Sequence, residues 1–406
     1  MPSSASRDGS SRGRLLKLLV ALWLAGVAMR MTILAMPPVI PLVHRELHMS
    51  ETQVGLLIGL PLLVFAAAAV PGSLLIARIG AVLAVVAGML IAALAGASRG
   101  AAIDVWTLYA AALTVGLGVA IMQPGLPTLV REWLPPERIA LGTIAYTAGM
   151  LMGATLAPVL TIPYVLPLVH GSWRLDLMFW SLPAALIIPV FFLLGPRRGK
   201  SSAAAAATAR RWWPSWNDPL IWLLGLTLGG NNSSYFSTNA FLGDYLVSNG
   251  RADLLGPALA WLNGFQLVAL VILLAMAGRL QRRAWPFLIF GPLLLASFLV
   301  MILVPTAFGI IAGAAMVGLT TAVTLTATLA LPALLSAPAD VPRTAAGMFT
   351  ISYTMAIIVP TISGALWDVT GRSWTAFVPL CACALSLTVL GVFAVRHRPR
   401  SQTLAL

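Results

Sequence analysis

An apolar run begins at Leu15 and ends at Val43, and it reads LLKLLVALWLAGVAMRMTILAMPPVIPLV. The run is long enough to cross a bilayer, whose hydrocarbon core of about 30 Å needs about 20 helical residues. Arg30 stands near its middle. A guanidinium at that depth costs at least about 3 kcal/mol and does not deprotonate, so it must face a protein interior or an aqueous cavity and find a partner there. No Asp or Glu lies at comparable depth in the other apolar segments, which makes the ligand a candidate for the counter-ion.

The composition of the whole chain is that of a polytopic membrane protein. Of its 406 residues 59% are hydrophobic and 9% are charged, whereas soluble domains are about 25% charged. Twelve apolar stretches predict an all-α fold with twelve transmembrane helices. They cover residues 15–43, 51–77, 80–98, 105–130, 139–169, 174–195, 219–247, 254–278, 285–305, 307–335, 344–367 and 374–395. A cleaved signal peptide is the alternative for the N-terminus, but the first run is too long and lacks a small-residue cleavage site.

The basic residues predict the orientation in the membrane. An even number of helices puts both termini on one side, and nineteen of the 25 Lys and Arg residues fall on that side against five on the other. Both termini should therefore be cytoplasmic, in a bacterial-type inner membrane. The net charge of +13 is spread over short loops, so topology and anionic lipid headgroups explain it and no nucleic acid is expected as a partner. Cys381 and Cys383 point to different faces of one helix and predict neither a disulfide nor a metal site.

A polar, basic connection near the midpoint divides the predicted helices six and six. Shifting the chain by 205 residues aligns residues 126–142 with 331–347 without a gap and with six identities. Parallel six-helix halves are the architecture of secondary transporters, whose ligand site lies between the halves at mid-depth. The predicted parts are an N-terminal tail (1–14), a first half (15–195), a cytoplasmic linker (196–218), a second half (219–395) and a C-terminal tail (396–406).

The same shift places Tyr235 at the position equivalent to Arg30. Tyr235 lies in a polar interruption of an apolar span, residues 229–239, where Asn231, Asn232, Tyr235 and Asn239 follow helical spacing and share one face. One interpretation is local unwinding of the helix around a substrate. The other is ordinary hydrogen bonding between helices by Asn and Ser side chains.

Three further amides lie within apolar spans. Gln123 precedes Pro124, which leaves a backbone carbonyl unpaired, so that substrate binding and a structural role are both open. Asn263 and Gln266 share a face of a later helix, with Trp261 nearby as a stacking or cation-binding wall. The alternative for these residues is packing between helices, which is also favoured for the threonines at 320, 324 and 328.

Some residues are candidates for gating or for coupling to protons. Gly149 and Gly153, followed by Pro158, allow two backbones to approach closely, either as ordinary packing or as a gating seam. His44 and His48 lie at the mouth of the first span, where titration near neutral pH would couple protons to transport unless the imidazoles are simply solvated.

The motifs of several other classes of protein are missing from the sequence. It has no HExxH, no GxSxG, no pair of carboxylates within the membrane and no loop large enough for a soluble catalytic domain. It also has no phosphate-binding loop that ends in Gly-Lys-Ser/Thr. We therefore expect no enzyme, no ATP drive, no cofactor and no metal.

Three short motifs resemble the major facilitator superfamily, and within it the branch of cyanate and 2-nitroimidazole transporters. They are Met29-Arg30-Met31 with the proline-rich exit at 37–42, Ala77-Arg78-Ile79-Gly80 after the second span, and Gln123-Pro124-Gly125-Leu126-Pro127 with the segment 132–135. The resemblance implies a twelve-helix secondary transporter with Arg78 in a conformational latch between the second and third helices. The superfamily usually has an acidic residue before that arginine, where this chain has Ala77.

The sequence thus predicts a monomeric secondary transporter that moves a small anion or an anion-like polar solute by alternating access. Arg30 would supply charge, and Tyr235 with its asparagine neighbours would supply hydrogen bonds. Anion import against an inside-negative potential costs about 2.3 kcal/mol per charge per 100 mV. A proton or another cation is therefore co-transported, or the solute leaves the cell, or it is neutral. The alternatives are a drug or metabolite efflux pump and, from another class, a membrane sensor that does not transport.

Overall fold

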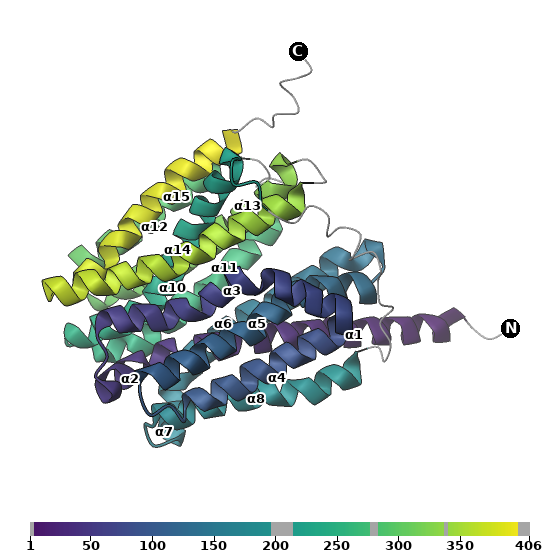
Figure 1. Cartoon of the computed structure of the whole chain (residues 1–406), viewed down its shortest axis with the longest axis horizontal. Coiled ribbons are helices and arrows are strands. Elements are labelled where there is room, and N and C mark those ends of the chain that lie inside the picture. Colours follow the sequence, from purple (N-terminus) through teal and green to yellow (C-terminus); the bar gives the residue numbers. More distant parts are fainter. Residues whose placement is uncertain (1–3, 196–213, 277–282, 337–339, 397–406) are drawn as a thin grey trace, which may run out of the picture. The chain divides into compact units, whose positions relative to one another are not determined.

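The computed structural model describes residues 4–195, 214–276, 283–336 and 340–396, and within these it is all-helical (Figure 1). Much of the predicted linker (196–213) and the C-terminal tail from residue 397 lie outside the described residues. Twelve helices of 19 residues or more run through the described part. They are α1 (Ser4–Leu34), α3 (Glu51–Ile79), α4 (Ala81–Arg99), α5 (Val105–Trp133), α6 (Ile139–Leu160), α8 (Trp173–Leu194), α10 (Pro219–Ser248), α11 (Leu255–Met276), α12 (Trp285–Leu303), α13 (Ala307–Leu335), α14 (Val341–Thr370) and α15 (Val378–Arg396). The predicted fold class is confirmed.

Ten segments of the described chain are long and apolar enough to cross a membrane. The first includes α1 and runs from Gly13 to Leu47. The two long helices outside this set are α3, whose apolar stretch over the described residues is Glu51–Phe65, and α10, whose centre is polar.

The first predicted span is not one continuous helix. α1 ends at Leu34, a short 3₁₀ turn, η1, covers Pro37–Val39, and the helix α2 runs from Ile40 to Leu47. Pro37 and Pro38 explain the break, because proline lacks the N–H that a continuing helix needs and disfavours helical geometry in the residue before it. Because of this break, His44 and Arg30 lie on different helices: His44 belongs to α2 and Arg30 to α1.

The described residues form two compact units. The first includes the described parts of 1–36, 68–160 and 164–206. Within it α1 packs against α6 and α8, and α4 packs against α5 and runs beside α8 (Figure 1). The α1–α6 contact depends on glycine, because a Cβ at Gly149 would lie 2.0 Å from the carbonyl oxygen of Trp23, and one at Gly153 would lie 2.3 Å from that of Val27.

The second unit includes 37–67, 161–163 and the described residues from 207 onward. α10 packs against α14 and α15, and α12 packs against α13 and α15. These pairings repeat those of α1 with α6 and α8 and of α4 with α5 and α8, as an internal sequence repeat would produce. The unit also holds η1, α2 and the start of α3, where a Cβ at Gly55 would lie 2.2 Å from the carbonyl oxygen of Pro360 in α14.

Candidate functional site

α10 carries most of the polar residues singled out in the sequence, and it is a continuous helix. Asp218 caps its N-terminus by accepting a hydrogen bond from the N–H of Leu220 at 3.0 Å, and Pro219 stands at the first helical position. Residues 229–239 are helical throughout, so the predicted unwinding is wrong. Two of the polar side chains bond to the helix itself, since Asn239 Nδ2 and Thr238 Oγ1 donate to carbonyls one turn back.

Tyr235, Asn239 and Asn263 form a buried hydrogen-bonded cluster between α10 and α11. The Tyr235 hydroxyl donates to Asn263 Oδ1 at 2.6 Å, and Asn263 Nδ2 donates to Asn239 Oδ1 at 3.1 Å. Gln266 Nε2 lies 3.5 Å from the same Asn263 oxygen. Asn263 is fully buried, and Tyr235, Asn239 and Gln266 are nearly so. The structure therefore brings together four of the predicted site residues, from two helices.

The remaining two asparagines of α10 contact other helices. Asn231 Oδ1 lies 2.6 Å from Thr324 Oγ1 of α13, and Asn232 Nδ2 donates to Ser352 Oγ of α14 at 2.9 Å. Both contacts join segments about a hundred residues apart, so nothing in the sequence pointed to Ser352. Packing was favoured for Thr324, and its hydroxyl does also donate to the carbonyl of Thr320 in its own helix.

Three serines complete the polar centre of α10. Ser233, Ser234 and Ser237 are fully buried, and over the described residues their hydroxyls have no hydrogen-bond partner. Buried hydroxyls normally find partners, since leaving one unpaired costs about 1–3 kcal/mol. The centre of α10 therefore has hydrogen-bonding capacity that the contacts within the protein do not use.

Arg30 and Gln123 lie in the first unit. Arg30 is half-buried in α1, midway along the Gly13–Leu47 span, and Gln123 is half-buried in α5. Both side chains are engaged in contacts within the described chain. A basic residue just beyond the predicted span 80–98 is also buried here. Arg99, at the end of α4, is 3% exposed, and its Nη2 donates to the carbonyl oxygen of Thr32 at 2.5 Å.

The other predicted residues take separate positions. Trp261 is 48% exposed on α11, with its ring centroid 5.2 Å from that of Phe265, and it is outside the hydrogen-bonded cluster. Arg78 is exposed in the last turn of α3. Pro158 is buried near the end of α6, before a π-helical turn over Thr161–Val165.

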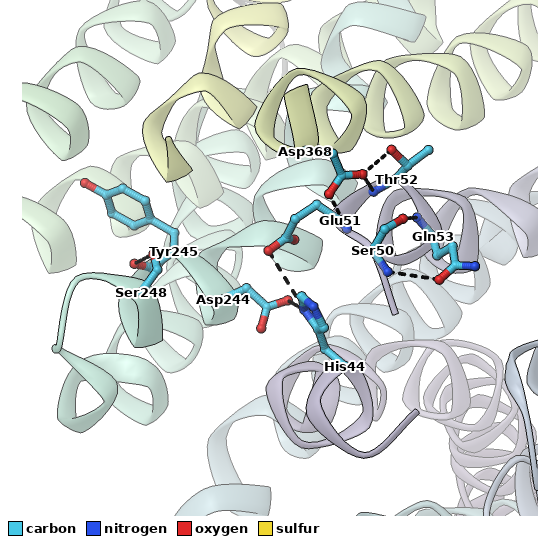
Figure 2. A network of polar contacts seen from close by, with 9 residues as sticks. All are labelled: His44, Ser50, Glu51, Thr52, Gln53, Asp244, Tyr245, Ser248 and Asp368. Carbon is cyan, nitrogen blue, oxygen red and sulfur yellow. Dashed lines mark hydrogen bonds and ion pairs between the residues drawn. The ribbon is translucent and has the colours of Figure 1, made fainter. Parts of the chain in front are cut away.

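The two candidate histidines have different environments. His48 is exposed and ends α2 with a positive φ of 48°. His44 is half-buried, and its Nδ1 lies 3.0 Å from Asp244 Oδ2 of α10 and 3.9 Å from Glu51 Oε1 of α3 (Figure 2). The structure thus gives His44 acidic partners that the sequence did not reveal.

The family of the chain follows from its similarity to known proteins. The model of the Major Facilitator Superfamily matches residues 18–280, well over half of the chain. The chain belongs to this superfamily. Superfamily membership confirms the sequence resemblance, identifies the chain as a secondary transporter of the multi-pass membrane type, and confirms that it is not an enzyme.

Individual superfamily relatives narrow the resemblance. The chain is 27% identical to the cyanate transport protein of Escherichia coli K12 over 385 aligned residues. The aligned region covers 93% of this chain and 98% of the relative. The chain is also 25% identical to the 2-nitroimidazole transporter of the same organism over 255 aligned residues, and this aligned region covers 62% of each chain. Both belong to the branch that the sequence motifs resemble.

Solved superfamily structures share the fold. The D-xylose–proton symporter superposes with a TM-score of 0.75 over 96% of this chain and 99% of its own, at 11% identity. A bacterial homologue of the human lysosomal transporter Spinster, in an inward-facing and unoccupied conformation, superposes with a TM-score of 0.67 over 93% of each chain, at 17% identity. At these identities the likeness extends to the fold alone.

Proposed function

We propose that the chain transports a small anion, or a compact polar solute with strong hydrogen-bond acceptors, across a bacterial cytoplasmic membrane, with both termini in the cytoplasm. One observation carries the proposal, the half-buried guanidinium of Arg30 midway along the first apolar span. A permanent positive charge at bilayer depth is expensive and usually marks a path for a substrate or an ion. The charge and depth of Arg30 set it apart from the other basic residues, and its side chain also has contacts within the protein.

The hydroxyl groups at the centre of α10 support the same chemistry. Ser233, Ser234 and Ser237 are buried, and over the described residues their hydroxyls have no hydrogen-bond partner, so they can donate to an acceptor. Cyanate is a small anion, and a nitroimidazole presents nitro and ring acceptors, so the substrates in the names of the two relatives need donors of this kind. A small solute that accepts several hydrogen bonds suits this donor set.

The proposal leaves three routes for an anion. Import against an inside-negative potential costs about 2.3 kcal/mol per charge per 100 mV, so the anion enters with a cation, leaves the cell, or crosses as a neutral species. Counterflow into proteoliposomes with the membrane potential clamped detects transport by any of these routes, because it measures exchange without net charge movement.

The test uses labelled cyanate and labelled 2-nitroimidazole in counterflow with the purified chain. Arg30→Gln should lose substrate affinity by about 10- to 100-fold, since hydrogen bonds to a charged group contribute about 1.5–3 kcal/mol. Arg372→Gln is the matched control, because it makes the same substitution at an exposed arginine after α14. Normal affinity in Arg30→Gln would refute the central role of the charge, and binding without any flux would identify a sensor instead.

A further inference from the structure

We propose that His44, Glu51 and Asp244 form a binding site for a divalent transition-metal ion such as Zn²⁺, where α2, α3 and α10 meet. One ligand atom from each residue lies within 4.8 Å of the other two. Figure 2 shows the Glu51 carboxylate and the Asp244 carboxylate both directed toward the His44 ring. The sequence predicted no metal site, because Asp244 is 200 residues from His44.

The spacing of the three ligand atoms fits a tetrahedral ion. Zn²⁺ binds nitrogen and carboxylate oxygen at about 2.0–2.2 Å, which puts two tetrahedral ligands about 3.4 Å apart. The observed distances from His44 Nδ1 are 3.0 Å to Asp244 Oδ2 and 3.9 Å to Glu51 Oε1. Small side-chain rotations would therefore complete the site and leave a fourth position for water.

Glu51 supplies the second, independent observation. Its side chain is 10% exposed, and over the described residues its Oε2 is buried with no hydrogen-bond partner. An ionised carboxylate buried in this way is costly unless a positive group compensates it. A cation held between Glu51, His44 and Asp244 would supply that compensation.

The charges around His44 also favour a cation. Three carboxylates act on this imidazole, from Glu51 of α3, Asp244 of α10 and Asp368 of α14. Asp368 is satisfied as a cap of α3, since it accepts from the N–H groups of Glu51 and Thr52 at 2.9 Å and from Thr52 Oγ1 at 2.5 Å. That leaves the Glu51 and Asp244 carboxylates facing the His44 imidazole, and one divalent ion can take a ligand atom from each of the three residues.

The surrounding structure holds the ligands in place. The Asp368 bonds fix the first turn of α3, and Ser50 and Gln53 cap the same turn reciprocally, with N···O distances of 2.9 and 3.2 Å. A Cβ at Gly364 would lie 2.2 Å from the carbonyl oxygen of Glu51, so only glycine lets α14 approach this closely. Supports of this kind orient metal ligands and raise their affinity. The His44 side chain is 26% exposed, which leaves a path from water.

The experiment measures the thermal stability of the purified full-length chain in detergent as Zn²⁺ or Mg²⁺ is added. The wild-type chain should be stabilised by Zn²⁺, with saturation at about one ion per chain, and hardly at all by Mg²⁺, which prefers oxygen ligands. Glu51→Gln should weaken the zinc affinity by about 100-fold, at or beyond the loss usual for residues that only support metal ligands. Glu51→Gln keeps the shape of the side chain and removes a buried charge, so the variant should fold. His44→Ala should weaken the zinc affinity to a similar extent.

His48→Ala is the matched control, because it removes an exposed imidazole of the same segment and should leave the zinc effect unchanged. Two results would overturn the proposal: no zinc effect on the wild-type chain, or an equal zinc effect on the wild-type chain and on Glu51→Gln. A second measurement rests on the proposed function. Zn²⁺ should inhibit counterflow by the wild-type chain and not by Glu51→Gln. Zinc binding with no flux under any condition would leave the metal site standing and refute the transport proposal.

Discussion

The contact between α1 and α6 allows a stability prediction with a defined sign. In the variant Gly149→Ala the new Cβ would lie 2.0 Å from the carbonyl oxygen of Trp23, where ordinary contacts begin at 3.4 Å. The two helices must therefore separate by about 1.4 Å or bend, and overpacking of this kind costs about 1–3 kcal/mol. Alanine recovers about 0.5–1 kcal/mol through its helix propensity. We expect a net loss of about 1–2 kcal/mol in the free energy of unfolding.

The control is Gly264→Ala in α11, where a Cβ would meet nothing within 4 Å. The free energy of unfolding of this variant should be unchanged or higher by up to about 1 kcal/mol. Only the alanine at position 149 should therefore lower the stability. Unfolding in mild detergent, followed by tryptophan fluorescence during titration with a denaturing detergent, measures both. If Gly149→Ala matched Gly264→Ala in stability, the close approach of α1 to α6 would be wrong.

Two further predictions test the α10–α11 cluster and a helix cap. In a double-mutant cycle of Tyr235→Phe and Asn263→Ala, the free energies of unfolding should be non-additive by about 0.6–1.7 kcal/mol, the range of hydrogen bonds between membrane helices, and additive values would contradict the 2.6 Å bond. Asp104 caps α5 outside the membrane span, and the hydrogen bond from the backbone N–H of Thr107 holds the pKa of its carboxyl below the ordinary value. This stabilisation is present above the ordinary pKa of Asp and disappears as pH falls through the folded-state value, so Asp104→Ala should destabilise at neutral pH and match wild type in acid thermal melts.

The lengths of the apolar runs, and the polar segments that separate them, predicted most of the fold. Each of the twelve predicted spans corresponds to a helix, because runs of about 20 apolar residues have few alternatives in a membrane. Hydropathy alone gives the first span as one continuous run, but Pro37 and Pro38 lack the N–H groups that a continuing helix needs, and the helix breaks there. α1 also begins before the predicted span, at Ser4.

The polar clusters were harder to predict, because they depend on pairings between distant segments. The spacing of Tyr235 and Asn239, and that of Asn263 and Gln266, gave each helix face correctly, but only the folded chain shows that Asn263 joins the two faces. The local helical pattern also gave no sign that Asp244 would meet His44. Asp244 lies near the end of the predicted span 219–247, where water at the membrane surface would solvate an acidic side chain, so its presence there does not call for a partner.

α10 links the two proposals physically. Asn239 of the hydrogen-bonded cluster and Asp244 of the proposed metal site are five residues apart on this helix, which is about 7.5 Å along its axis. The intervening residues 240–243 are all buried and helical. We therefore expect a shift of α10 at one position to be carried to the other. A solute that moves α10 at Asn239 would therefore alter the spacing of His44 and Asp244. By linkage, a metal ion that fixes this spacing would change the affinity for the solute by the same factor.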